Sequence, residues 1–154
     1  MVRMATLLVL CLVCALRGAF CAAADAETDQ KLRKLLASRV EALPRPIIRE
    51  SYLDVLEREA VRLAAEVDAT AIPALQAICK NPRMSRGFMN KDMARLAALT
   101  LAKMPGQPKA VEALERLVRE ADYRTGAGIA YEGIGYLPTP LARELVERLA
   151  RQAT

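Results

Sequence analysis

The residues with the clearest potential for recognition chemistry lie in the segment 80–91, KNPRMSRGFMNK. The segment has four basic residues and no acid, and its apolar side chains have no evident helical stripe to join. The residues that we expect to contact a partner are Lys80, Arg83, Arg86, Phe88 and Lys91. A basic loop with an apolar tip can bind an acidic protein, an anionic membrane surface or a polyanion. The alternative is a solvated connector whose Phe88 and Met89 pack under neighbouring helices.

The chain offers little for catalysis. It contains no His, which excludes histidine bases, His-containing triads and histidine metal ligands. Acidic pairs such as Asp54 with Glu57 lack an opposing group that would define an acid/base site. No group of Cys, Asp and Glu has metal-ligand spacing. We therefore expect no enzymatic activity, no cofactor and no bound metal.

Four closely spaced glycines between Gly126 and Gly135 raise the question of a phosphate-binding loop. A dinucleotide fingerprint fails because Tyr131 stands where its third Gly is needed, and a P-loop fails because its Lys and Ser or Thr are missing. Gly126 with Gly133, and Gly128 with Gly135, are each separated by close to two helical turns, so each pair shares a helix face. We expect these glycines to serve close packing between helices.

The first 24 residues have the three-part layout of a secretory signal peptide. Arg3 precedes an uncharged run from Met4 to Leu16, and Arg17 precedes a stretch of small residues. As a helix that run would rise only about 20 Å, short of the roughly 30 Å hydrocarbon core of a bilayer. We therefore expect export to the periplasm or the cell exterior, cleavage between residues 21 and 24, and no stable transmembrane anchor in the mature chain.

Removal of this leader changes the composition of the chain. The apolar fraction falls from 53% to about 48%, which is ordinary for a globular domain. The net charge falls from +5 to +3, because 21 of 23 basic residues and all 18 acids remain. Cys79 becomes the only thiol, so no internal disulfide can form. Its apolar neighbours at helical spacing favour a buried small hydrophobe over a reactive thiol. Acylation of Cys21 is a weaker alternative, because Phe20 precedes it.

Apolar spacing and helix breakers predict an all-α chain without strands. The predicted helices span about residues 28–43, 51–67, 70–80, 91–104, 109–121, 123–137 and 139–151. Asn90 and Thr139 are the expected N-caps of the fourth and seventh helices. Charged residues of the later helices, such as Arg95 and Glu115, are expected on solvated faces with weak ion pairs at helical spacing.

The helices also repeat along the chain. Three pairs of segments share a pattern: ALERLVRE (113–120) with LVERLARQ (145–152), LAKMP (101–105) with IGYLP (134–138), and AIPALQAI (71–78) with AVEALERL (110–117). The offsets run from about 32 to about 39 residues, and each covers two helices, as is typical of an α-solenoid. An unrelated helical bundle is the alternative fold.

On these segments the chain resembles the HEAT-repeat family and its armadillo-like relatives over about residues 70–152. The resemblance implies a short α-solenoid of antiparallel helix pairs. The chain departs from the family pattern in having about two and a half repeats and a longer linker within the first. Because one helical pair cannot bury its own apolar face, we expect residues 25–69 to form N-terminal capping helices and residues 70–154 the stacked repeats.

The family resemblance also implies a function. We expect an exported, non-catalytic protein-interaction module, an adaptor or accessory subunit, that binds another protein through its concave face and the basic loop. Tyr131 and Tyr136, with Tyr123, are candidates for that face. The alternative is binding to an anionic membrane surface or a polyanion through the loop 80–91. Export argues against a nucleic-acid partner.

The leader gives the first testable prediction. Intact-mass measurement of the protein from the cell envelope or medium should give a chain that starts at a residue between Ala22 and Asp25. A cytosolic protein that retains residues 1–24 would contradict the export hypothesis.

Overall fold

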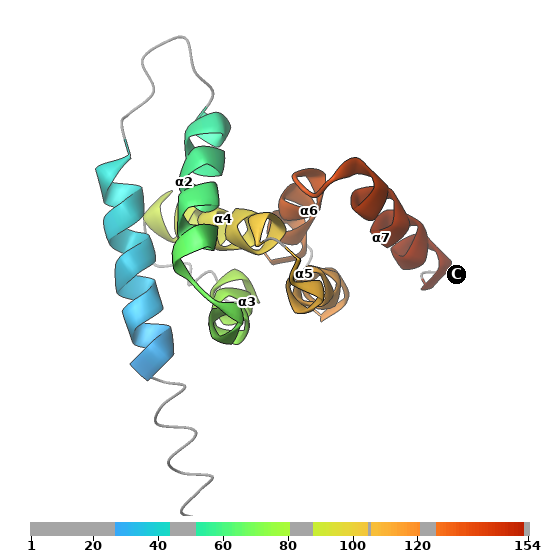
Figure 1. Ribbon diagram of the computed structural model, residues 1–154, viewed down its shortest axis with the longest axis horizontal. Helices are drawn as coiled ribbons and strands as arrows, with labels where there is room; N and C mark the ends of the chain where they lie inside the picture. Colours follow the sequence, from blue (N-terminus) through green and yellow to red (C-terminus); the bar gives the residue numbers. More distant parts are fainter. Residues whose placement is uncertain (1–26, 44–51, 81–87, 105, 121–125, 153–154) are drawn as a thin grey trace, which may run out of the picture.

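A computed structural model describes residues 27–43, 52–80, 88–104, 106–120 and 126–152, where the chain forms helices joined by short connections and contains no strand (Figure 1). The helices are an N-terminal helix over residues 27–42, α2 (Tyr52–Glu66), α3 (Ile72–Lys80, after a 3-10 turn at Ala69–Ala71), α4 (Phe88–Lys103), α5 (Pro108–Glu120), α6 (Gly128–Gly135) and α7 (Thr139–Gln152). The expectation of an all-α fold is confirmed. The predicted leader, residues 1–24, lies outside the described residues.

Two predicted N-caps are wrong, although most helix bounds agree with the sequence to within a few positions. α4 begins at Phe88, so Asn90 lies within its first turn instead of capping it. No helix-breaking residue lies between Gly87 and Asn90 in the sequence, so the helix can begin directly after Gly87. In α7 the amide of Ala142 donates to the carbonyl of Pro138 at 2.9 Å. That bond makes Pro138 the capping residue, one position before the predicted one.

The last turn of α6 also ends earlier than the predicted residue 137. The amides of Tyr136 and Leu137 donate to the carbonyls of Gly133 and Ile134, at 3.0 and 3.1 Å. Bonds of this 3-10 type tighten the end of an α-helix. The chain can therefore turn directly into α7.

The central element of the fold is α4, which packs against α2, α3, α5 and α6. Figure 1 shows α2 lying across α4 on one side, with α6 on the other. Every residue from 96 to 102 is buried, because neighbours cover the helix on all sides. The one polar residue in that run, Thr100, donates its hydroxyl to the carbonyl of Leu96 at 2.7 Å. The helix thus buries no unsatisfied hydroxyl there.

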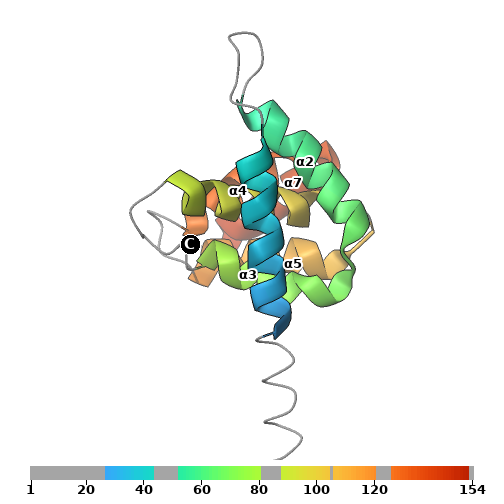
Figure 2. The same ribbon diagram turned by 90° about the vertical axis from the view of Figure 1, so that its left-hand side faces the viewer.

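The N-terminal helix lies beside α2 (Figures 1 and 2) and contributes buried Leu32 and Leu36 to the core. Arg39 reaches across to two carboxylates of α2: Glu59 at 2.9 Å and Glu66 at 2.8 Å. Glu59 is buried and also lies 3.4 Å from Arg62 of α2, so two cations offset the desolvation cost of its carboxylate. The contacts of Arg39 therefore help to hold the N-terminal helix against α2.

The C-terminal helix α7 is attached in a similar way. Leu145 and Leu149 are its buried residues, and Arg148 forms an ion pair with Glu115 of α5 at 3.1 Å. Glu115 is buried and also pairs with Arg119 at 3.3 Å. The prediction that Glu115 lies on a solvated face is wrong, because α7 covers that side of α5.

The predicted packing role of the glycines holds for one residue and fails for another. A Cβ on Gly133 would meet the carbonyl oxygen of Ala98 in α4 at 3.0 Å and a methyl of Leu114 in α5 at 3.2 Å. A Cβ on Gly135 would have nothing within 4 Å. Gly133 is thus the residue that lets α6 approach α4, whereas Gly135 has open space beside it.

Among the described residues, no helix has the length and apolar character needed to cross a bilayer.

This contrast gives a matched pair of substitutions. Gly135→Ala should raise the free energy of unfolding by up to about 1 kcal/mol, because it adds only helix propensity. Gly133→Ala gains the same propensity but overpacks the contact with α4, at a cost of about 1–3 kcal/mol. Urea unfolding should therefore find the Gly133→Ala protein less stable than the Gly135→Ala protein by at least about 1 kcal/mol. Equal stability of the two variants would show that α6 is not held against α4 at Gly133.

Candidate functional site

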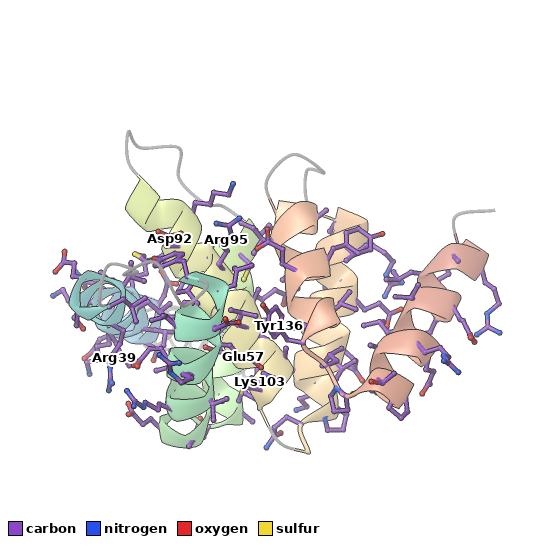
Figure 3. The ribbon with its side chains drawn as sticks, turned by 90° about the horizontal axis from the view of Figure 1, so that it is seen from above. Arg39, Glu57, Asp92, Arg95, Lys103 and Tyr136 are labelled. Atoms are coloured by element: carbon purple, nitrogen blue, oxygen red, sulfur yellow. The ribbon has the colours of Figure 1, made fainter. Side chains whose placement is uncertain are left out.

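One row of polar side chains lies on α4 between its two flanking helices. Asp92, Arg95 and Lys103 occupy positions that fall on the same face of the helix. Figure 3 shows these side chains together with Glu57 of α2 and Tyr136, which follows α6. Each of them makes contacts with a neighbouring helix, and they form two clusters.

The first cluster is centred on Arg95. Its guanidinium binds Glu132 of α6 with two hydrogen bonds, from Nε at 2.8 Å and from Nη2 at 3.1 Å. This bidentate contact raises the pKa of Arg95 above its ordinary value. Asp92 lies 3.8 Å from Arg95 and accepts a hydrogen bond from the hydroxyl of Tyr52 in α2. The expectation that Arg95 lies on a solvated face is wrong, since only 23% of its side chain is exposed.

The second cluster is centred on Lys103, at the other end of α4. Its ammonium lies 2.6 Å from a carboxylate oxygen of Glu57 in α2. It also lies over the ring of Tyr136, 5.5 Å from the ring centre, within the range of a cation–π interaction. The two clusters therefore link α2, α4 and α6 at both ends of α4. Their cations already have anionic partners within the fold.

A groove opens beside the second cluster, where the turn from α4 to α5 meets the turn from α6 to α7. It has a volume of about 840 Å³, within the range of ligand-binding sites in proteins. Its apolar lining includes Met104, Val111, Tyr136, Leu137 and Leu141. Its charged lining consists of Lys103, Glu112, Glu144 and Arg148. We call this feature the α5–α7 groove, because the N-terminal turns of both helices border it.

The α4–α5 turn at one edge of the groove depends on Gly106. This residue has φ of +64°, in the left-handed region that side chains other than Gly rarely adopt. The turn allows α5 to start at Pro108, where the missing amide hydrogen costs no helical hydrogen bond. The sequence indicates the α4–α5 turn after LAKMP and the α6–α7 turn after the similar IGYLP. It does not predict that a groove lies between these two turns.

The structure places only part of the predicted binding segment. Lys80 ends α3, is exposed and pairs with Glu120 of α5 at 3.2 Å. Lys91 is exposed in the first turn of α4. Arg83 and Arg86 lie outside the described residues, and of Phe88 only the backbone is described, as the first residue of α4. The segment is thus helical from Phe88 onward, and its exposed Lys80 forms a surface ion pair with an acid of α5.

Cys79 is buried, as predicted from its apolar neighbours. No part of it is exposed, and its thiol donates to the carbonyl of Ala94 in α4 at 3.4 Å. Burial raises the pKa of the thiol to about 12. The thiolate is the reactive form of Cys, so this residue is inert at neutral pH.

Of the candidate tyrosines, Tyr131 is 46% exposed on α6. Tyr136 packs against the core and lines the groove. Tyr123 lies outside the described residues.

The described part of the chain contains no cluster of three potential metal ligands. Comparisons with protein families, curated proteins and solved structures find no match to this chain.

The first cluster gives a pH prediction. Desolvation raises the pKa of Tyr52 to about 12, and its hydrogen bond to Asp92 and the charge of Asp92 act in the same direction. Unfolding returns Tyr52 to its ordinary pKa near 10. Its contribution to stability is therefore complete below about pH 10 and is lost as the pH rises towards about 12.

The measurement is urea unfolding between about pH 9 and pH 12 for the parent protein and Tyr52→Phe. The free energy of unfolding should fall less steeply with pH in Tyr52→Phe, because Phe does not ionise. Identical slopes would show that Tyr52 has an ordinary pKa in the folded protein.

Proposed function

We propose that residues 70–152 form a short HEAT-like solenoid. Four cross-helix contacts support this arrangement, because each joins residues about one predicted repeat apart: Lys103 with Tyr136, Glu115 with Arg148, Arg95 with Glu132, and Lys80 with Glu120. The last two pairs have sequence separations of 37 and 40, and the first two have slightly shorter ones. These separations are close to the offsets of the repeats in the sequence. Stacked repeats bring equivalent positions side by side in this way.

The order of helix contacts gives independent support. α4 packs between α2 and α6, and α3 packs against α5. Alternate helices are thus neighbours, as in two layers of a solenoid, while α3 with α4 and α5 with α6 pack as consecutive pairs. The N-terminal helix and α2 then act as the predicted cap at one end, and α7 closes the other.

We further propose that this chain is an exported, non-catalytic protein-interaction module that binds another protein. The α5–α7 groove is the observation that carries this function. A groove of about 840 Å³ with apolar and charged lining can receive a segment of a partner protein. Export rests on the leader in the sequence. The basic segment 80–91 is a second contact region for the same partner.

The test is affinity capture from the exported fraction with Leu141→Lys, which places a charge in the apolar lining of the groove. Capture of the partner should weaken at least about tenfold, as expected when an unpaired charge enters an interface. Val146→Lys is the matched control, because Val146 lies on the same helix, is 48% exposed and does not line the groove. Circular dichroism should show that both variants fold.

The segment 80–91 is tested separately by replacing Arg83, Arg86 and Phe88 with Ser. If this variant loses the partner and Leu141→Lys does not, the chain is still a protein-interaction module, but its binding site is the segment 80–91 and not the groove. If the parent protein instead captures no protein and floats with liposomes of anionic lipid, the proposed function is wrong and the surface-binding alternative replaces it.

A further inference from the structure

We propose that the α5–α7 groove binds a peptide segment of the partner in which an Arg or Lys lies next to an apolar side chain. Glu112 and Glu144 receive the cation, and the apolar lining receives its neighbour. This inference rests on the proposed function and specifies the chemistry of the partner at that site.

The charge of the groove is the first reason. Each of its two cations already has an anionic partner, since Lys103 lies 2.6 Å from Glu57 and Arg148 lies 3.1 Å from Glu115, although the buried Nε of Arg148 has no hydrogen-bond partner among the described residues. Its two acids have no ion-pair or hydrogen-bond partner among the described residues. The charged lining is balanced by itself, but when Glu57, Glu115 and the Arg119 that also pairs with Glu115 are counted, four carboxylates stand against three cations and leave a small excess of negative charge. A cationic ligand is therefore favoured over an anionic one.

The relative position of the two acids is the second reason. Pro108 and Thr139, the first residues of α5 and α7, both line the groove, so both helices start at its edge. The ion pair between Glu115 and Arg148 joins them about two turns further along. Glu112 and Glu144 each lie about one turn before that pair, on the side towards the groove. Both carboxylates therefore face the same cavity from neighbouring helices.

The lining next to these acids is the third reason. Val111 precedes Glu112 on α5, and Leu141 lies about one turn before Glu144 on α7. Both are partly buried, so their remaining apolar surface faces the groove. A long cationic side chain suits such a site, because its methylene stem can lie on apolar surface while its charged end reaches a carboxylate. The ring of Tyr136 adds apolar surface to the lining.

The test is selection of binders from a random peptide library displayed against the purified full protein. Enriched peptides should contain an Arg or Lys beside an apolar residue. Fluorescence anisotropy should then show that each of Glu112→Gln and Glu144→Gln weakens binding by about threefold to fivefold, the effect of losing one exposed ion pair. Binding should also weaken as the salt concentration rises. Glu147→Gln is the matched control, because Glu147 lies on α7 outside the groove and should leave binding unchanged.

The outcomes separate this inference from the proposed function. If selected peptides lose binding in Leu141→Lys but contain no cation or are insensitive to Glu112→Gln and Glu144→Gln, the groove binds a partner and the inferred charge preference is wrong. Enrichment of acidic peptides would likewise show that the inferred preference for a cation is wrong. If no peptide is enriched, or if enriched peptides are insensitive to Leu141→Lys as well, the groove is not a peptide site and both proposals fail there.

Discussion

Complete burial of the middle of α4 is the constraint on which the rest of the structure depends. A helix with Leu and Ala on every side cannot remain in water, so four other helices must cover it. Small residues set how close they come: Ala98 of α4 lies opposite Gly133 of α6, where even a methyl group would be crowded. The positions of α2, α3, α5 and α6 all follow from the need to enclose this one helix.

Ion pairs then fix the elements that apolar packing alone would leave loosely placed. The first and last described helices are attached in the same manner, each by an Arg that binds a buried Glu of its neighbour: Arg39 with Glu59, and Arg148 with Glu115. Each buried Glu also has a cation on its own helix, Arg62 at 3.4 Å from Glu59 and Arg119 at 3.3 Å from Glu115, so the pairs between helices add to apolar packing in placing the terminal helices. At the ends of α4, Arg95 and Lys103 serve the same purpose towards α2 and α6.

The sequence predicted the helical elements well, because apolar spacing and Pro or Gly breakers are local signals. It also predicted the burial of Cys79 and one close glycine contact. The sequence-based predictions failed for residues whose burial depends on a helix distant in the chain. On their own helices Arg95 and Glu115 have the spacing of solvated charges. In the folded chain α6 covers Arg95 and α7 covers Glu115, and the local sequence does not contain that information. The groove was missed for the same reason, since two turns about one repeat apart in the sequence form it together.

Local pairing also changes what the overall charge of the chain implies. A net positive chain with the basic segment 80–91 suggests acidic partners, but many cations are already paired inside the fold, including Lys80, Lys103 and Arg148. Lys91 lies near one end of α4 and the groove at the other, roughly 20 Å apart along a helix of 16 residues. Exposed Lys91 and the groove, whose two acids are unpaired among the described residues, thus lie at opposite ends of the same helix. If the proposed partner contacts both ends, the opposite charges of these residues favour one orientation of the partner on the fold.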